Sequence, residues 1–306
     1  MPGKQLYRIK SISEFHEFRG LPKPEHPLIS VVDYKHVKNT SDNNSLSWAA
    51  DYYSISLKRT TNTKLRYGQQ KYDFDEGVMF FMAPGQVVSI EVTPNSAPQH
   101  SGWILLIHPD FLWNTPLARS IKQYHYFDYA VNEALFLSDK EEAIVTNIIQ
   151  TIQQEYHSNI DKFSQDIIIS QIQVLLNYAE RFYQRQFITR KITNHKVLAK
   201  LEELLDEYFK EDNIVNKGLP TVQYIADKLN LSPTYLSEML KVLTGQSTQQ
   251  HIHNKLIEKA KEKLSTTDLS VSEIAYELGF EHPQSFSKLF KTKTKISPLE
   301  FRKSFN

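Results

Sequence analysis

The sequence is 306 residues long, contains no cysteine and carries a formal net charge of +1, with 36 basic and 35 acidic side chains. This length suggests about two domains, and the lack of cysteine excludes disulfides, thiolate nucleophiles and cysteine-bound metals. No run approaches the ~18 apolar residues of a membrane span, and the N-terminus lacks the apolar core of an export signal, so we expect a cytoplasmic protein.

The first part of the chain, from Leu28 to about Ile107, has the pattern of short strands. Runs rich in β-branched and aromatic residues are separated by clusters of Gly, Pro, Asn and Asp, which is typical of an all-β unit. The runs are 28–34, 52–57, 78–82, 86–92 and 102–107. They predict a small antiparallel barrel or jelly roll within residues 1–138. The segment 77–85 (GVMFFMAPG) resembles a strand and turn of a cupin barrel.

A barrel of this kind serves either to bind a small organic molecule or to hold a catalytic metal. The first use needs an apolar cavity with a few polar anchors, although aromatic residues in a small barrel are more often ordinary core. The candidate lining residues are Tyr52, Tyr67, Tyr72, Phe74 and Trp103.

The metal alternative lacks a ligand set. Cupin metal sites use a His-x-His pair, a glutamate and a histidine shortly after the Pro-Gly turn, where this chain has Val88. The His-x-His pair of His251 and His253 lies at the start of a predicted helix, where side chains two residues apart diverge. We therefore predict no metal, no cofactor and no catalytic residue.

Two periodic helices are expected after the barrel, over 139–157 and 164–186, and we assign 139–187 to this helical pair. Their apolar stripes either pair two subunits or pack within one subunit. The stripes are Ile144, Ile148, Ile152 and Tyr156, then Ile168, Ile172, Leu175, Leu176, Ala179, Phe182 and Tyr183. Residues 188–195 form the predicted linker. Arg181, Arg185, Arg190 and Lys191 near it either contact phosphate or solubilise the junction.

The chain then repeats one small unit between Val222 and Phe290. Val222, Ile225, Ala226, Leu229 and Leu231 return 49 residues later, and Leu236, Ser237, Leu240 and Lys241 return 50 residues later. Each copy has the apolar period of a helix, a break and a second helix, which indicates a helix-turn-helix.

Turn chemistry agrees with this interpretation. Ser232 and Pro233 suit the start of a second helix, Ser270 with Glu273 suits a capping box, and Pro283 again marks a helix start. Between the copies, Ile252, Leu256, Ala260 and Leu264 stripe a bridging helix over 248–264, which spans roughly 25 Å.

Four motifs stand in the C-terminal third: Gly245-Gln246-Ser247, the run from Ser270 to Phe280, Phe286-Ser287-Lys288-x-Phe290-Lys291, and Ser297-Pro298-x2-Phe301-Arg302. Together they closely resemble the AraC/XylS family of bacterial transcription regulators over residues 196–306. One departure is Lys295, where the family usually has glycine. The resemblance implies a DNA-binding domain with two helix-turn-helix units over 196–306. It also implies a cupin-like sensing domain before them and helices that pair subunits.

Base-reading residues are expected on the outward side of the second helix of each copy, because the first turn of that helix enters the major groove. Leu236, Met239 and Leu240 in one copy, and Phe286, Leu289 and Phe290 in the other, are assigned to the core. The candidate DNA contacts are Thr234, Ser237, Glu238, Lys241, Gln284, Ser287, Lys288 and Lys291.

These candidates differ in chemistry. Gln284 suits an adenine edge, and Glu238 either accepts from cytosine N4 or forms a salt bridge. Ser237 and Ser287 suit phosphate contacts or backbone caps. Residues 286–306 hold six basic side chains against Glu300, a net charge of +5, which favours phosphate binding.

We therefore predict an α+β protein of two domains that acts as a sequence-specific DNA-binding transcription regulator and not as an enzyme. The expected partners are double-stranded promoter or operator DNA, a small-molecule effector and a second copy of the chain. RNA polymerase is left open as a further partner, no membrane is expected, and the location is the cytoplasm at the nucleoid. The alternatives are a cupin-type metal-dependent enzyme and an architectural DNA binder without an effector.

Overall fold

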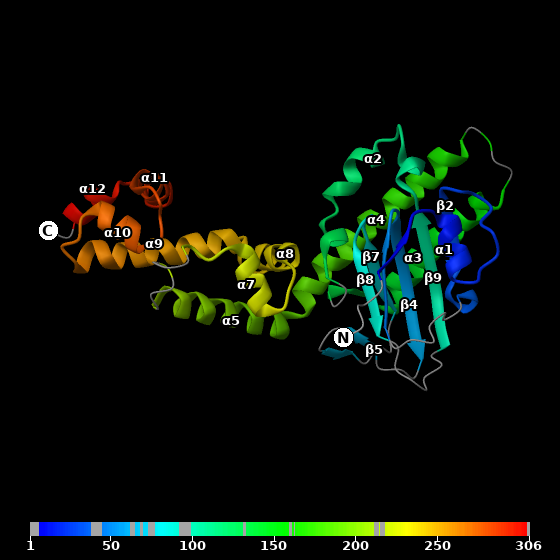
Figure 1. Ribbon diagram of the computed structural model, residues 1–306, viewed down its shortest axis with the longest axis horizontal. Coiled ribbons are helices and arrows are strands. Elements are labelled where there is room, and N and C mark those ends of the chain that lie inside the picture. The colour runs from blue at the N-terminus through cyan, green and yellow to red at the C-terminus, as the bar shows by residue number, and fades with distance from the viewer. Residues whose placement is uncertain are drawn as a thin grey trace. The chain divides into compact units, whose positions relative to one another are not determined.

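The chain is described by a computed structural model over residues 6–37, 45–61, 65–67, 70–72, 77–91, 99–130, 133–158, 161, 163–210, 214 and 218–304. It divides into two compact units, Met1–Gln186 and Phe187–Asn306 (Figure 1). The first unit contains all the described strands together with helices, and the described part of the second is helical. Within the described ranges, no helix is both long enough and apolar enough to cross a membrane. The predicted α+β class with a helical C-terminal region is confirmed.

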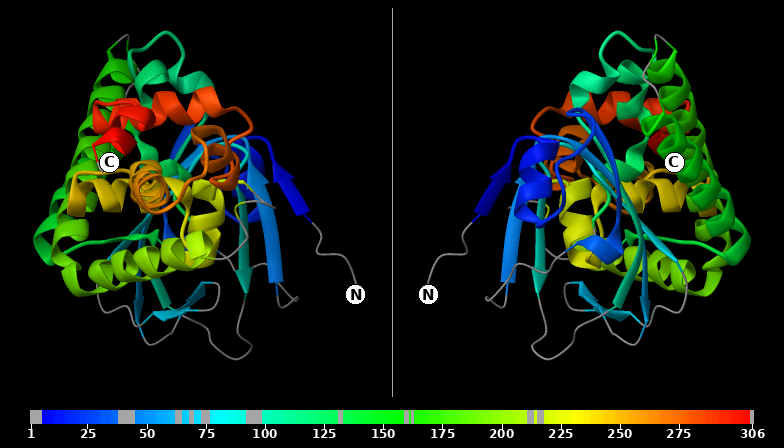
Figure 2. Two further views of the ribbon diagram at one scale, coloured as in Figure 1. Left: turned by 90° about the vertical axis from the view of Figure 1, so that its left-hand side faces the viewer. Right: turned by 90° about the vertical axis from the view of Figure 1, so that its right-hand side faces the viewer.

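The main sheet of the first unit has five strands in the order β10-β7-β4-β9-β2, and each neighbouring pair is antiparallel. Its bounds are β2 Ile29–Asp33, β4 Tyr53–Thr61, β7 Val78–Met82, β9 Gln99–Ile107 and β10 Leu135–Phe136. Successive side chains alternate between the two faces of a sheet. Helices α3 and α4 lie on one side of these strands and β1 on the other (Figure 2).

A second sheet has the order β1-β3-β8, with β1 Leu6–Ile9, β3 Ser45–Ala50 and β8 Val87–Glu91. A short hairpin joins β5 Leu65–Tyr67 to β6 Gln70–Tyr72. The described strands therefore form three separate sheets, and they do not close into a barrel. Strands β1 and β3, which lie outside the predicted runs, pair in parallel. A parallel pair needs a long connection, and α1 and β2 lie between these two strands.

An apolar cluster lies between the two larger sheets. It combines residues of both sheets with the buried face of α1, Ile12–Phe18, whose first turn is capped by the Ser11 hydroxyl accepting from the Glu14 amide. We call it the inter-sheet cluster, and its buried members are Ile9, Ile12, Phe15, Val32, Trp48, Ala50, Tyr52, Ile104 and Leu106.

The two predicted helices after the strands are confirmed as α3, Asp139–Tyr156, and α4, Ser164–Thr189. Every predicted apolar residue of the α4 stripe is buried, as are Ile148, Ile152 and Tyr156 of α3. These stripes pack within one subunit, so they are not available to pair two subunits. The segment 188–195, predicted as a linker, is mostly helical, because α4 ends at Thr189 and α5, Lys191–Lys210, begins two residues later.

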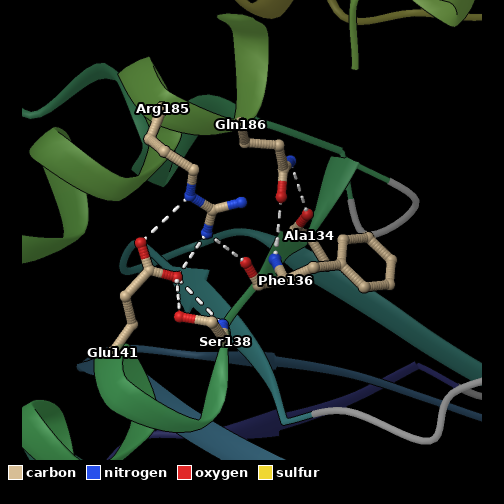
Figure 3. A network of polar contacts seen from close by, with 6 residues as sticks. All are labelled: Ala134, Phe136, Ser138, Glu141, Arg185 and Gln186. Carbon is tan, nitrogen blue, oxygen red and sulfur yellow. Dashed lines mark hydrogen bonds and ion pairs between the residues drawn. The ribbon is translucent and has the colours of Figure 1, made fainter. Parts of the chain in front are cut away.

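A polar network ties α3, α4 and β10 together (Figure 3). Arg185 donates from Nε to Glu141 Oε1 at 3.0 Å, and from Nη2 to Glu141 Oε2 at 2.6 Å and to the Phe136 carbonyl at 2.7 Å. Gln186 accepts from the Phe136 amide at 2.8 Å and donates to the Ala134 carbonyl at 3.1 Å. Arg185 thus helps to hold this corner of the first unit, and its contact with phosphate stays a prediction.

The second unit repeats one helix pair, as the sequence predicts. The first copy is α7 Val222–Leu229 with α8 Pro233–Thr244, and the second is α10 Val271–Glu277 with α11 Pro283–Thr294. The bridging helix is α9, Thr248–Thr266, and α12, Pro298–Lys303, follows the second copy. Helix α5 packs against α7, α8 and α9.

The predicted turn chemistry is confirmed. The Ser232 hydroxyl accepts from the Tyr235 amide with Pro233 in the first turn of α8, and Ser270 with Glu273 forms a capping box at α10. Helices α8 and α11 end alike, because Gly245 after α8 and Lys295 after α11 both take a left-handed backbone, with φ of 74° and 69°. Lys295 therefore keeps the geometry of a C-terminal glycine cap without being glycine.

Candidate nucleic-acid interface

Helices α8 and α11 each turn one face into the core of the second unit. In α8 the buried residues are Tyr235, Leu236, Met239 and Leu240, and in α11 they are Phe286 and Phe290. Phe286 contacts Phe280 in a tilted arrangement and Phe290 contacts Phe301 edge-to-face, with ring centres 5.5 Å apart in each pair. Leu289, which was assigned to the core, is half-buried. With the aromatic face fixed inward, the polar face of α11 turns outward.

The outward face of α11 is a continuous polar surface. Gln284 in the first turn, Lys288 one turn later and Lys291 are all exposed, whereas Ser287 is half-buried. Ser285 and Thr292 are exposed as well, although the sequence analysis did not include them. Ser285, Lys288 and Thr292 are three and four residues apart, so the helical period alone indicates that they share a face.

The first copy exposes fewer of its candidate DNA contacts than the second copy does. Lys241 is exposed, but Thr234, Ser237 and Glu238 are half-buried. Ser237 Oγ lies 3.0 Å from Oγ1 of the fully buried Thr248, which ties α8 to the start of α9. Glu238 forms an ion pair with Lys241 at 2.7 Å, and its side chain is 19% exposed. The salt-bridge alternative for Glu238 is therefore the one that the structure contains.

The basic side chains after residue 286 divide by what they contact. Arg302 donates to the carbonyls of Leu264 and Leu269, at 3.2 and 2.6 Å, and so caps the end of α9. Lys293 donates to Asn254 Oδ1 at 3.2 Å. The Lys288 ammonium is exposed and makes no hydrogen bond or ion pair with any part of the chain that the structure describes, although the Lys288 carbonyl accepts from Thr292 Oγ1. The net charge of +5 over residues 286–306 therefore overstates the number of cations available to phosphate. Lys288 is the clearest available cation.

Helix α9 fixes the separation of the two copies. It has 19 residues, hence a length of about 28 Å, and its buried stripe of Ile252, Leu256, Ala260 and Leu264 is as predicted. Both α8 and α11 pack against it, and Lys263 pairs with Glu277 of α10 at 2.6 Å. Successive major-groove faces on one side of B-DNA lie about 34 Å apart. A single stiff helix thus holds two candidate reading helices at a comparable spacing.

The candidate ligand residues of the first unit do not share one wall. Tyr52 is buried in the inter-sheet cluster, and Trp103 is buried beside Ile104 of that cluster, so the alternation of β9 places Trp103 on the other face of the sheet. Tyr52 Oη and Trp103 Nε1 have no hydrogen-bond partner within the described chain. The side chains of Tyr67, Tyr72 and Phe74 lie outside the described residues.

The first unit also has a cavity of about 460 Å³ between the 25–29 segment, Asp110 and the ends of α3 and α4. Four carboxylates line it and no lysine or arginine does: Glu25, Asp110, Glu155 and Asp161. Such a lining disfavours an anionic ligand.

The His-x-His pair is occupied by other contacts. His251 Nε2 lies 3.0 Å from Thr244 Oγ1, and His253 Nε2 lies 2.8 Å from Gln249 Nε2. Burial lowers the pKa of both histidines, and the charge of Lys293 lowers the pKa of His253 further. Within the described ranges, no three His, Cys, Asp or Glu side chains are grouped so as to hold a metal ion.

Known proteins resemble mainly the region of the two helix-turn-helix units. A family model described as a helix-turn-helix domain matches residues 225–304. The chain is 31% identical over 137 residues to the uncharacterized transcriptional regulatory protein YesN of Bacillus subtilis, covering 44% of this chain and 36% of YesN. It is 31% identical over 142 residues to the HTH-type transcriptional activator RhaS of Salmonella schwarzengrund, covering 45% of each protein. It is also 29% identical over 107 residues to histidine kinase P4 of Formosa agariphila, covering 34% of this chain and 8% of the kinase. The chain thus spans less than half the length of each of these relatives.

Proposed function

We propose, from the premise that this chain belongs through its C-terminal region to the AraC/XylS family of transcription regulators, that it regulates transcription by binding a specific duplex sequence. The observation that carries the proposal is the second unit itself. Two helix pairs repeat, one stiff helix spaces them, and α11 exposes Gln284 and Lys288 on the face away from its aromatic core.

The outward residues have two proposed roles, contact with base edges and contact with phosphate. Gln284 in the first turn of α11 presents an amide, which suits the N6 and N7 edge of adenine. Lys288 and Lys291 supply cations for phosphate, and Lys241, which pairs with Glu238, and Thr234 at the start of α8 are further contacts. Ser237 and Glu238 act as positioning residues, because each is bound within the unit. Ser287 stays a weaker candidate, since it is half-buried.

Selection of bound duplexes from a random pool, followed by gel shifts across a salt series, tests this function. Lys288→Ala is expected to weaken binding similarly for all sequences and to reduce the salt slope by about 1. Gln284→Ala is expected to relax the preference at one base pair, at a cost of about 1–3 kcal/mol for the preferred base.

Lys140→Ala is the matched control, because Lys140 is an exposed lysine of α3 in the other unit. It should leave both affinity and salt slope unchanged. A wild-type protein that enriches no sequence from the pool, or two α11 variants that bind like wild type, would contradict the proposal.

We further propose that the first unit is a cupin-like sensing and pairing domain without enzymatic activity. Its α4 stripe is used internally, but the opposite face of α4 exposes Ile167 and Val174, at 42% and 40%. These two residues are seven apart and so lie on one side of the helix, where a second copy can cover them. An effector would act by favouring one arrangement of the readers over another. Contact with RNA polymerase stays a prediction.

A further inference from the structure

One arginine of the first unit is buried without a counter-ion. Arg19 follows α1 and is 9% exposed, and its Nε is fully enclosed without a hydrogen-bond partner. No hydrogen bond or ion pair joins its guanidinium to any described residue. An unpaired charge in an apolar interior is strongly destabilising, and for this reason buried arginines are normally paired.

The surroundings of Arg19 are aromatic. Its guanidinium carbon lies 5.0 Å from the ring centre of Trp48, 5.4 Å from that of Phe18 and 6.0 Å from that of Phe15. Ring faces attract a cation, but they offer no lone pair to the five N–H donors of a guanidinium. The rings therefore stabilise the charge only in part, and the enclosed Nε of Arg19 still lacks an acceptor.

The nearby ionisable groups do not supply that acceptor. They are Tyr34 and Tyr52, and burial lowers the pKa of Arg19 although both tyrosines raise it. Burial also raises the pKa of the Tyr52 phenol well above its ordinary value, so this side chain is neutral. Tyr52 Oη is itself enclosed without a partner, which makes it a second buried donor in the same cluster.

The other polar groups near the inter-sheet cluster are hydrogen-bonded or positive, apart from the exposed Glu14 carboxylate, which raises the pKa of Tyr52 further. His16, next to Phe15, has one ring nitrogen 2.5 Å from the Pro22 carbonyl and the other 3.0 Å from Ser30 Oγ. Lys58 Nζ lies 5.1 Å from the ring centre of Tyr34, which brings a second cation toward the same neighbourhood. This region therefore attracts negative charge, in contrast to the carboxylate-lined cavity near Asp110.

We propose that Arg19 and Tyr52 form the anchor of a binding site for a small carboxylate with an apolar body. A carboxylate accepts two parallel hydrogen bonds from a guanidinium and has lone pairs left for a phenol. The apolar part would lie among Phe15, Phe18 and Trp48. This inference rests on the proposed function, since it names the class of effector that the first unit senses.

Thermal unfolding of the full chain with sodium hexanoate or sodium phenylacetate tests the site, with sodium chloride at equal ionic strength as the reference. Each carboxylate is expected to raise the melting temperature saturably, by about 3–10 °C at ten to a hundred times its Kd. Hexanamide and phenylacetamide have the same bodies without the charge, and they should give no shift.

Arg19→Met should abolish the carboxylate shift and leave the ligand-free protein at least as stable as wild type, because it removes an unpaired buried charge. Tyr52→Phe should weaken carboxylate binding several-fold. Arg8→Met is the matched control, because Arg8 is an arginine of the same unit that is 68% exposed and pairs with Asp51. It should respond like wild type.

Two results would overturn the site: a wild-type protein that neither carboxylate stabilises, or an Arg19→Met variant that responds like wild type. Should Arg19→Met fail to fold, Arg19→Lys decides, because it keeps the charge and loses the planar fork. Unchanged carboxylate affinity in Arg19→Lys and Tyr52→Phe together would also count against the site. Gel shifts on the same preparations separate the two proposals, since intact DNA selection without a carboxylate shift refutes the site alone.

Discussion

Helices α8 and α11 are each followed by a residue with a left-handed backbone, which is glycine in the first copy and lysine in the second. Gly245 and Lys295 are 50 residues apart, in the register of the repeat, and each amide donates to the carbonyl of Lys241 or Lys291. Only glycine takes positive φ without steric cost. The second copy therefore carries backbone strain that the first does not.

Lys295→Gly is expected to stabilise the protein by about 0.5–1 kcal/mol, because relief of the left-handed strain exceeds the added freedom of the unfolded chain. The midpoint of denaturant unfolding measures it. Lys295→Ala keeps the β-carbon and removes the same charge, so it should give no gain. Equal stabilisation by both variants would assign the effect to the charge and contradict the backbone argument.

Single-residue predictions from the sequence succeeded where the partner is local. The caps at Ser232 and Ser270 bind an amide three residues away, and both are present. Partners that folding brings from a distance were not predictable, because no local pattern marks them. Ser237 finds Thr248 across 11 residues, and Arg302 finds the Leu264 carbonyl across 38.

At the scale of elements, the pairing of β4 with β9 depends on one glycine. Gly102 has a φ of 120°, and a β-carbon there would lie 2.1 Å from the carbonyl oxygen of Leu57, the residue before its register partner Lys58 on β4.

Gly102→Ala is expected to lower the free energy of unfolding by about 2–5 kcal/mol through strain and overlap. Equilibrium unfolding of the first unit, followed by tryptophan fluorescence, measures the loss. Ser101→Ala, at the next position of β9, should cost far less. Similar stability of the two variants would show that the backbone there is free to shift.

Helix α4 has a buried stripe and an opposite face that exposes Ile167 and Val174. If that face pairs two copies, Ile167→Asp with Val174→Asp should convert a dimer into a monomer, because two charges cannot be buried unpaired. Light scattering coupled to size-exclusion chromatography gives the mass. Gln173→Asp adds a charge to another exposed position of α4 and should leave the mass unchanged. A double variant that keeps the dimer mass would move the interface elsewhere.

The positions of most helices and strands could be predicted from the periodicity of apolar residues, but the way in which they assemble could not. Strands β2, β4, β7, β8 and β9 and helices α3, α4 and α9 lie where the apolar patterns place them. The parallel pairing of β1 with β3 was missed, because strand direction depends on the route of the chain rather than on alternation. Helix α5 was missed because its first residues were assigned to a linker, although Leu201, Leu205 and Tyr208 have a helical spacing.

At the scale of the whole molecule, the proposed function makes α9 the element that sets the spacing of the DNA sites. A stiff helix holds the two readers at one separation, so a bound site must present two grooves at one spacing. A flexible tether would instead tolerate any spacing that restores the same side of the duplex.

Insertion of 5 or of 10 base pairs between the two contacted half-sites of a selected duplex is therefore expected to reduce affinity to a similar, low level. Fluorescence anisotropy with the full chain measures both duplexes against the parent. Substitutions of the same length outside the half-sites serve as the control and should have little effect. Recovery of affinity at 10 base pairs would show that the readers move independently.

Gly279 makes the two halves of the repeat unequal. Its φ is 79°, and the equivalent residue of the first copy, Asn230, has a φ of 56°. Asparagine can therefore adopt the left-handed backbone that both turns require. A β-carbon at residue 279, however, would come within 2.9 Å of Ile214 Cγ2 and 3.2 Å of Gly218. The turn of the first copy should therefore accept glycine at residue 230, whereas the turn of the second copy has no room for an asparagine side chain at residue 279.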